Sequence, residues 1–281
     1  MKKTLFIVAM LFCTLLPTTA QVFHANPVAM PFQHPWTGAK VGFIGDSISD
    51  KVYCYPEVKR YFEFLKEWLG LDIAVGAQSG FQWIHIPELL KRMDAELKGQ
   101  EPDAIVIFLG TNDYSVDLPI GEFYEETMDE VWAGLGYQKT LQKRRHRHLV
   151  FTDDTFKGRL NKYIKIICED HPRAQIVLLT PIHRGLFDAG NDNLQPDEDY
   201  VNRAGLYLED YVEAIKEAAN VWSVQVIDMH AKAALSPMQD VHAEYYADEK
   251  KDRLHPNTLG QEQMARTLFY QTSIIPIGIR K

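Results

Sequence analysis

Cysteine is scarce in this chain, with three residues in 281, and no long apolar run follows the first twenty positions. Cys13 lies inside the N-terminal apolar stretch, so only Cys54 and Cys168 remain beyond it, and neither has the spacing of a metal-ligand motif. A disulfide framework is therefore excluded, although the sequence leaves open whether these two cysteines pair. The lack of a second long apolar run predicts no stable membrane span.

Positive charge is also in short supply. The chain has 30 lysine and arginine residues against 38 aspartate and glutamate residues, a formal net charge of −8. We therefore expect no nucleic-acid partner. One basic run, residues 139–148, stands out, and we expect it to form a solvated loop or hairpin, with contact to an anionic substrate as the alternative. Internal repeats and low-complexity linkers are lacking too.

Residues 1–20 have the three parts of a secretory signal peptide. Two lysines precede an apolar stretch from Leu5 to Leu16, and small residues up to Ala20 suit a cleavage site. The stretch is short for a membrane span. We expect an exported protein, periplasmic or extracellular after cleavage near Ala20, with a retained anchor as the alternative. Residues 21–281 are then predicted to form a single domain.

Short apolar runs alternate with amphipathic segments from residue 40 onwards. The runs predict strands over residues 40–44, 71–75, 104–109, 175–179 and 224–227. Apolar residues recurring every three or four positions predict helices over residues 56–69, 86–97, 156–168, 200–219 and 257–272. Strands that alternate with helices imply right-handed crossovers and a parallel sheet. The predicted fold class is α/β, a three-layer α/β/α arrangement with five parallel strands.

Two long excursions interrupt this alternation. The first, residues 115–152, contains the basic run. The second, residues 185–199, is rich in Gly, Asn, Asp and Pro, and it follows a strand at the edge of the sheet where open α/β folds bind ligands. We therefore expect the second excursion to shape a pocket.

The first predicted strand ends in Gly45-Asp46-Ser47. A serine at such a turn projects above the carboxyl edge of a parallel sheet, near the free N–H groups of a helix N-terminus. Ser47 is therefore the candidate nucleophile. The alternative is that Ser47 and Ser49 only cap a helix, because short motifs also occur by chance.

Two neighbouring strand ends offer hydrogen-bond donors. Asn112 follows the third strand in Gly110-Thr111-Asn112-Asp113, and a neutral amide beside a nucleophile suits the oxyanion of a tetrahedral intermediate. An Asx-turn that satisfies its own loop is the alternative for Asn112. Gly80, after the second strand, lets a backbone N–H approach the same oxyanion without a side chain in the way.

A base with an orienting carboxylate comes near the C-terminus. Asp252 and His255 are three residues apart, so one tight turn can place the carboxylate against one ring nitrogen while the other faces the cleft. A serine nucleophile requires such a pair. Pro256 then suits the first turn of the last predicted helix.

These four blocks resemble the signature blocks of the SGNH hydrolases, also called the GDSL esterase/lipase superfamily. In family order they are residues 45–49, Gly80, residues 110–113 and residues 252–256, and they span nearly the whole predicted domain. The resemblance implies a flavodoxin-like sheet with Ser47 as nucleophile, His255 as general base and Asp252 as the residue that orients the imidazole. It implies an oxyanion hole made by the Ser47 N–H, the Gly80 N–H and the Asn112 amide.

The second block departs from the family pattern. Members usually carry Asn a few residues before the glycine, and here that place is taken by Val75. Gly76 therefore competes with Gly80 as the residue whose N–H faces the oxyanion. No metal and no organic cofactor are expected for this chemistry. A metallophosphoesterase using Asp46, Asn112, Asp113, His183 and His255 is the imaginable rival, but the sequence lacks the His-bearing motifs of such enzymes.

The expected substrates are small acyl esters, chiefly acetyl, on carbohydrate. An exported esterase without an obvious amphipathic lid suits a water-soluble polymer. Trp83, His183 and Arg184 lie where a sugar could stack or hydrogen-bond, although aromatic and arginine residues beside strand ends are commonly structural. A lipolytic or thioester-cleaving relative and a non-catalytic glycan-binding protein are the alternatives. The sequence defines neither the glycan, nor the acyl position, nor the oligomeric state.

Overall fold

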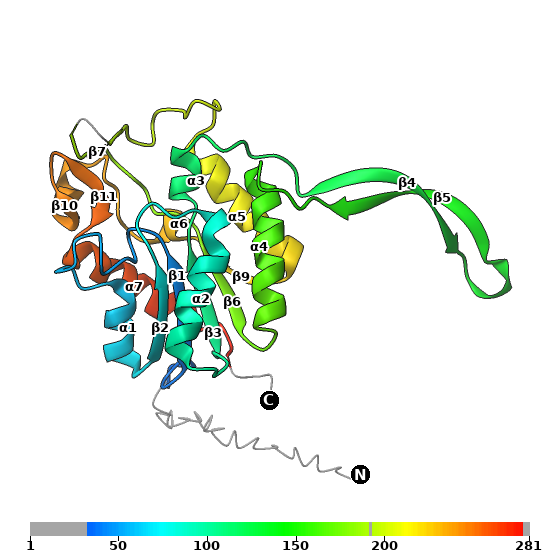
Figure 1. Cartoon of the computed structure of the whole chain (residues 1–281), viewed down its shortest axis with the longest axis horizontal. Coiled ribbons are helices and arrows are strands. Elements are labelled where there is room, and N and C mark those ends of the chain that lie inside the picture. Colours follow the sequence, from blue (N-terminus) through cyan, green and yellow to red (C-terminus); the bar gives the residue numbers. More distant parts are fainter. Residues whose placement is uncertain (1–32, 191–192, 278–281) are drawn as a thin grey trace, which may run out of the picture. The chain divides into compact units, whose positions relative to one another are not determined.

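A five-stranded parallel sheet forms the centre of the computed structural model, which describes residues 33–190 and 193–277 (Figure 1). Its order is β2-β1-β3-β6-β9, and every neighbouring pair is parallel. The strands are β1 (Lys40–Gly45), β2 (Asp72–Ala77), β3 (Ala104–Phe108), β6 (Gln175–Leu179) and β9 (Gln225–Ile227). The predicted five-stranded α/β sheet is therefore confirmed. The expected signal peptide, residues 1–20, lies outside the described residues.

Helices cover both faces of this sheet (Figure 1). One layer is α1 (Tyr61–Leu69) and α7 (Thr258–Thr272), and the other is α2 (Ile86–Leu97), α4 (Phe156–Asp170) and α5 (Leu208–Trp222). Successive residues of a strand point to opposite faces. Ile105 and Ile107 of β3 accordingly join the core under α2, α4 and α5, whereas Val106 joins the core under α1 and α7. Every residue of β3 is buried, which explains its continuous apolar run.

The predicted ends of helices and strands agree best with the structure where the apolar pattern of the sequence matches the buried face. The predicted helix over 86–97 and the predicted strand over 175–179 coincide with α2 and β6. The helix predicted over 56–69 begins later, at Tyr61, because the buried Arg60 side chain instead holds the preceding loop through backbone carbonyls.

The helix predicted over 200–219 is wrong at its N-terminal end, because α5 begins at Leu208. The side-chain oxygen of Asn202 accepts hydrogen bonds from the backbone N–H groups of Ala204 and Leu206, at 3.0 and 3.1 Å. These bonds give the backbone an alternative to helical hydrogen bonds. The helical spacing of apolar residues therefore extends to positions before Leu208, where the backbone is not helical.

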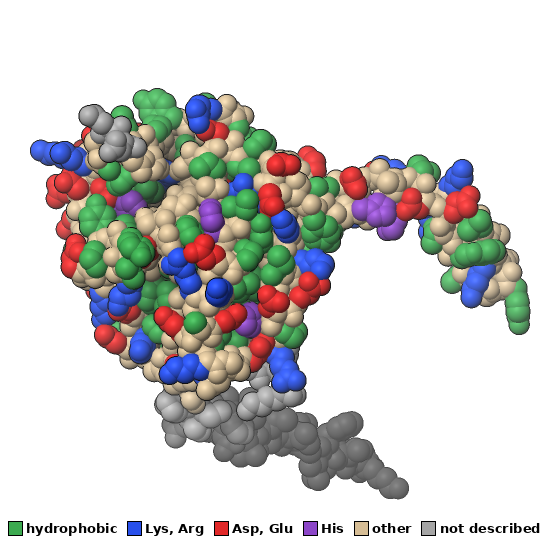
Figure 2. Space-filling model, in the orientation of Figure 1, with side chains coloured by type: hydrophobic (Ala, Val, Ile, Leu, Met, Phe, Trp, Pro, Cys, Tyr) green, Lys and Arg blue, Asp and Glu red, His purple; other side chains and the backbone are tan. Residues whose placement is uncertain are grey.

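An antiparallel hairpin, β4 (Tyr124–Ala133) and β5 (Thr140–Leu149), extends away from the helical layers (Figure 1). Most of the basic run 139–148 lies in β5, opposite the acidic residues of β4, so that in the strand register Glu126 faces Arg147 and Asp129 faces Arg144. Acidic, basic and histidine side chains are all visible along this arm (Figure 2). The basic run is thus a mostly exposed hairpin strand, as expected, with opposite charges beside it.

A second, four-stranded sheet has the order β10-β11-β7-β8. Its strands are β7 (Phe187–Asp188), β8 (Leu194–Gln195), β10 (Tyr246–Asp248) and β11 (Asp252–Pro256). The sequence pattern does not predict this sheet, because strands of two to five residues are too short to show an alternation of apolar and polar residues. The excursion 185–199 supplies β7 and β8, and β7 pairs with β11.

Two further observations concern membrane-spanning helices and the cysteines. Among the described residues, no helix has both the length and the apolar character needed to cross a membrane. Cys54 and Cys168 are not bonded to each other.

Candidate active site

The carboxyl ends of β1 and β2 lead into the turns that contain Ser47 and Gly80, and β3 leads into a short helix, α3 (Thr111–Ser115), that contains Asn112. β1 lies between β2 and β3, so the three segments share one edge of the sheet. His255 reaches the same edge from β11 of the second sheet. Residues from four separate stretches of the chain therefore meet at one place.

Ser47, His255 and Asp252 form one hydrogen-bonded chain. Ser47 Oγ lies 2.9 Å from His255 Nε2, and His255 Nδ1 lies 2.8 Å from Asp252 Oδ2. The three residues are 6%, 6% and 3% exposed. A proton on Nδ1 is held by the carboxylate, which leaves Nε2 as the acceptor for the serine hydroxyl.

Several donors converge on the Asp252 carboxylate. Oδ1 accepts hydrogen bonds from the backbone N–H groups of Leu254 and His255, at 3.1 and 2.9 Å, and Oδ2 accepts one from the Tyr55 hydroxyl at 2.7 Å. Burial by itself raises the pKa of Asp252, but the interactions with His255 and Tyr55 outweigh it and hold that pKa below its usual range. Asp252 is thus an oriented, ionised partner for the imidazole.

Tyr55 reaches Asp252 from a tightly held loop. Its backbone has a φ of 44°, in the left-handed region that tyrosine rarely adopts. The Arg60 guanidinium, 1% exposed, fixes this loop by donating to the backbone carbonyls of Asp50, Cys54 and Tyr55. Burial and the hydrogen bond to Asp252 raise the pKa of the Tyr55 phenol, so its proton stays in place to donate.

We predict that Tyr55→Phe lowers kcat/KM about tenfold, the effect of one hydrogen bond to a charged group. Without the phenol, the Asp252 carboxylate loses a donor that stabilises its ionised form, so its pKa rises. The loss of activity at low pH that comes from protonation of Asp252, the ionised partner of His255, should therefore begin at higher pH. Tyr53→Phe is the matched control, because Tyr53 is 71% exposed. A wild-type profile in Tyr55→Phe would show that the phenol has no part in positioning.

Gly80 and Gly76 occupy different surroundings. Gly80 has a φ of +79°, and a Cβ built there meets nothing within 4 Å, so the residue lies in open space. Gly76 lies within β2 opposite Ile44, and a Cβ there would collide with the backbone carbonyl of Leu89 in α2. Packing of β2 against α2 thus explains Gly76, while Gly80 has the left-handed backbone and free approach that favour a glycine.

Asp50 holds the loop that leads to Gly80. Its Oδ2 accepts the backbone N–H of Ser79 at 2.7 Å, and its Oδ1 accepts that of Val52 at 2.7 Å. Among residues 33–190 and 193–277, the N–H groups of Ser47 and Gly80 make no hydrogen bond. Two backbone donors at this edge are therefore available to a ligand.

The Asn112 side chain is fixed by one of its two amide hydrogens, because Nδ2 donates to the carbonyl of Phe81 at 2.9 Å. The next residue, Asp113, is fully buried and forms an ion pair with Arg159 at 2.9 Å. It also accepts the backbone N–H of Trp83 at 3.2 Å. Asp113 and Arg159 thus connect α3 to the segment that follows Gly80.

Asp46, next to Ser47, is a buried acid with a structural contact. Its Oδ1 accepts the backbone N–H of Ile48 at 3.1 Å, which closes the turn that carries the serine. Burial raises the pKa of Asp46 to about 7. Asp46 therefore holds the turn. In the described part of the chain, its side chain makes no hydrogen bond to His255.

The three residues expected to touch a sugar have other surroundings. Trp83 is 1% exposed and packs in the core with α2. Arg184 is also 1% exposed, and its guanidinium donates to Ser115 and Gln195 at 2.7 and 2.6 Å. The His183 ring is paired with Glu198. Trp83 and Arg184 thus lie in the interior in this structure, and His183 keeps a side-chain exposure of 32%.

The sequence analysis missed the residues that hold the site in place. The partners of Tyr55, Arg60, Asp50 and Arg159 are distant in the chain or are backbone atoms. Arg60 and Arg159 fall in ranges predicted to be helical, but apolar periodicity says nothing about the partner of a charged side chain. An isolated Arg60 directly before a helix and an Asp50 three residues after Ser47 carry no pattern that distinguishes them from surface residues.

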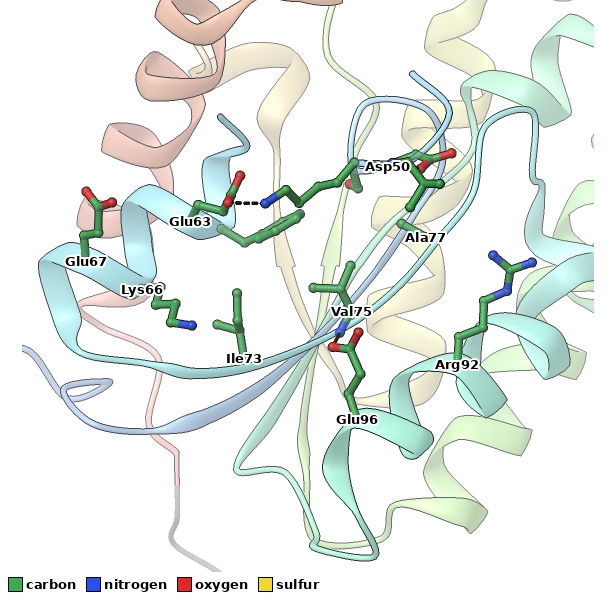
Figure 3. Close-up of a pocket in the computed structure, with 13 residues that line it drawn as sticks. Asp50, Glu63, Lys66, Glu67, Ile73, Val75, Ala77, Arg92 and Glu96 are labelled. Carbon is green, nitrogen blue, oxygen red and sulfur yellow. Dashed lines mark hydrogen bonds and ion pairs between the residues drawn. The ribbon is translucent and has the colours of Figure 1, made fainter. Parts of the chain in front are cut away.

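A groove of about 900 Å³ runs along β2, the edge strand of the sheet, between α1 and α2 (Figure 3). Ser49 and Asp50 line it near the Ser47 turn, but Ser47, Asn112 and His255 do not. The Glu96 carboxylate accepts the N–H of Val75 at 2.8 Å. This contact covers one open backbone group of the edge strand.

A serine hydroxyl hydrogen-bonded to an imidazole, whose other nitrogen contacts a carboxylate at the carboxyl edge of a parallel sheet, is the geometry of a serine hydrolase. The chain belongs to the GDSL-like lipase/acylhydrolase family, whose family model matches residues 43–263. It is an ester-hydrolysing enzyme of the SGNH superfamily.

Solved structures share the fold at low sequence identity. A possible lipase from Chitinophaga pinensis is 19% identical with a TM-score of 0.59, over 83% of this chain and 97% of that one. A protein from Parabacteroides merdae that is described as a GDSL-like lipase is 18% identical with a TM-score of 0.51, over 84% of this chain and 96% of that one. An acetylxylan esterase from Geobacillus stearothermophilus is 18% identical with a TM-score of 0.50, over 85% and 96%. No curated protein matches the chain in sequence.

Proposed function

We propose that this enzyme hydrolyses O-acyl esters, chiefly O-acetyl groups on carbohydrate, with Ser47 as nucleophile, His255 as general base and Asp252 as the group that orients the imidazole. The observation that carries the proposal is the continuous contact from Ser47 Oγ to His255 Nε2, at 2.9 Å, and from His255 Nδ1 to Asp252, at 2.8 Å. Both distances are within hydrogen-bond reach, as proton transfer requires.

The reaction follows from this geometry in two halves. Ser47 Oγ attacks the ester carbonyl carbon while its proton passes to His255 Nε2, and the carbonyl oxygen becomes an oxyanion. The oxyanion collapses, the bond to the alcohol breaks, and the alcohol leaves with the proton from Nε2. Water then gives a proton to the same nitrogen and attacks the acyl-serine. The acid departs and Ser47 regains its proton.

The oxyanion hole in this proposal consists of the N–H groups of Ser47 and Gly80 and the second amide hydrogen of Asn112. Three observations support it: the two backbone donors are without partners in the described part of the chain, Gly80 lies in open space, and the Phe81 carbonyl fixes the Asn112 amide beside Gly80. Donors held in advance stabilise the charge that develops in the transition state without reorganisation.

We predict that Asn112→Ala lowers kcat about 10²- to 10³-fold, because one donor to the oxyanion is lost. KM should change little, since the oxyanion exists only in the transition state. Steady-state kinetics with a soluble acetyl ester, together with a thermal unfolding curve, measure both effects. A rise in KM with an unchanged kcat would instead assign Asn112 to ground-state binding.

Two considerations support acetyl groups on carbohydrate. The chain shares its fold with an acetylxylan esterase, and the expected export after cleavage near Ala20 suits a polymeric glycan. Export belongs to the proposal, and the N-terminus of the secreted protein tests it.

The substrate is tested with a panel of acetylated glycans and of aryl esters with increasing acyl length. Acetate release from a glycan, with activity that falls steeply from short to long acyl chains, is the expected result. Activity that rises with chain length, or on thioesters, would support a lipolytic or thioesterase function. Glycan binding without turnover of any ester would leave a non-catalytic glycan-binding protein.

A further inference from the structure

A second group of ionisable side chains lies at the ends of β6 and β9. His183 follows β6, His230 lies in α6 (Met229–Lys232) directly after β9, and Glu198 lies in the segment after β8. One ligand atom from each of the three lies within 4.8 Å of the other two. The proposed ester chemistry uses none of these side chains.

The three side chains are in close contact. His183 Nδ1 hydrogen-bonds to Glu198 Oε1, and Glu198 Oε2 accepts the backbone N–H of Arg184 at 2.8 Å. Glu198 is 5% exposed, so its charge lies in the interior. The ring centroids of His183 and His230 are 3.6 Å apart. Two imidazoles and a carboxylate therefore share one small space.

His230 contributes a buried nitrogen without a partner. Its Nδ1 is closed off from solvent and makes no hydrogen bond to any described residue. Buried polar atoms almost always have a partner, so an orphaned ring nitrogen needs an explanation. Glu198, Glu209 and Asp228 place negative charge around both rings, which suits a metal cation.

We propose that His183, Glu198 and His230 bind a divalent transition-metal ion, with Zn²⁺ as the first candidate. Two imidazole nitrogens and one carboxylate oxygen are a common protein ligand set for zinc. Bonds of about 2.0–2.2 Å in a tetrahedron place the ligand atoms about 3.3 Å apart. Donors that already lie within 4.8 Å need only small side-chain rotations to reach this geometry.

The ion replaces the proton between His183 Nδ1 and Glu198, and it gives the His230 ring the partner that it lacks. One coordination position remains for water. The bound ion also connects the segment 185–199 to the ends of β6 and β9. That segment contains Phe187, whose ring lies edge-on to the His255 ring at 5.1 Å. The site therefore stabilises the part of the chain that supports the imidazole, without taking part in ester cleavage.

The test uses the full chain, stripped with a chelator and then titrated with Zn²⁺ by calorimetry and with Co²⁺ by visible absorption. We expect the intense Co²⁺ bands of a tetrahedral site. Free Zn²⁺ at about one hundred times Kd should raise Tm by about 5–10 °C. His230→Ala should weaken Zn²⁺ binding at least about 100-fold, since it removes a ligand itself.

Glu198→Gln is a second variant, because glutamine has the same shape and still accepts the N–H of Arg184. It should also weaken binding while the protein stays folded. A hairpin cluster, Asp129, His146 and His148, provides the matched control, since it also has three donors within 4.8 Å but is partly exposed to solvent.

The hairpin double variant His146→Ala/His148→Ala should keep the Tm shift and the Co²⁺ bands. The proposal is overturned if the wild-type chain shows no such bands and no Tm shift, or if the hairpin variant loses both while His230→Ala keeps them. These measurements involve no substrate, so their failure is distinct from a failure of the proposed ester hydrolysis.

Discussion

Ser47→Ala should lower kcat by about 10⁴- to 10⁶-fold and leave a folded protein. The expected loss is this large because the covalent acyl-serine route disappears, and only binding and the oxyanion donors remain to act on a water molecule. Acetate release from acetyl esters, measured with a sensitive continuous assay, gives kcat. Tm should change little, because the Ser47 oxygen has His255 as its hydrogen-bond partner and the backbone of the turn is unchanged.

Ser49→Ala is the matched control for this variant. Ser49 belongs to the same turn, but its Oγ lies 3.1 Å from the Tyr61 hydroxyl, in the core beneath α1. Its loss should cost about 1 kcal/mol of stability and leave kcat near the wild-type value. Equal activity in Ser47→Ala and the wild type would remove Ser47 as the nucleophile and would direct attention to another hydroxyl.

His255→Ala should lower kcat by about the same factor as Ser47→Ala, because a serine without a base is a weak nucleophile at neutral pH. The two residues act as one unit, so the double variant Ser47→Ala/His255→Ala should lose no more than the worse of the single variants. Losses that do not multiply are expected only when both residues act in the same chemical step. Single-turnover kinetics of all three variants measure it.

Two independent losses that multiply in the double variant would contradict a shared proton-transfer step between Ser47 and His255. His242→Ala is the control for removal of an imidazole, because the His242 ring accepts the backbone N–H of Ser236 and contacts Tyr245, away from Ser47. Wild-type kcat in His242→Ala would show that the effect belongs to His255.

The candidate site depends on supports that act over long sequence distances. Tyr55 precedes α1, yet it donates to Asp252 on β11. Arg159 on α4 reaches Asp113 after β3 and also donates to Gln82. Each support holds one of the turns that approach Ser47. The enzyme can therefore use irregular loops for its chemistry, because buried charges and hydrogen bonds hold those loops to the regular layers.

The alternation of strands and helices was predictable from the sequence, but the ends of some elements were not. β6 and α2 matched their predicted ranges, because a buried run and an amphipathic face leave a strong periodic signal. The N-terminus of α5 did not, because the Asn202 side chain bonds to the backbone of the preceding turn. The small sheet carrying His255 left no signal, since its strands are too short.

By itself the sequence determined the α/β class, the five strands and the candidate residues Ser47, Asn112, Asp252 and His255, because these rest on periodicity and on short motifs that are local in the chain. Only the tertiary structure decided the rest: the 2.9 Å contact between Ser47 and His255, the interior location of Trp83 and Arg184, and the gathering of His183, Glu198 and His230. The physical reason is that burial, charge pairing and ligand geometry depend on distances between segments remote in sequence, which no local pattern encodes.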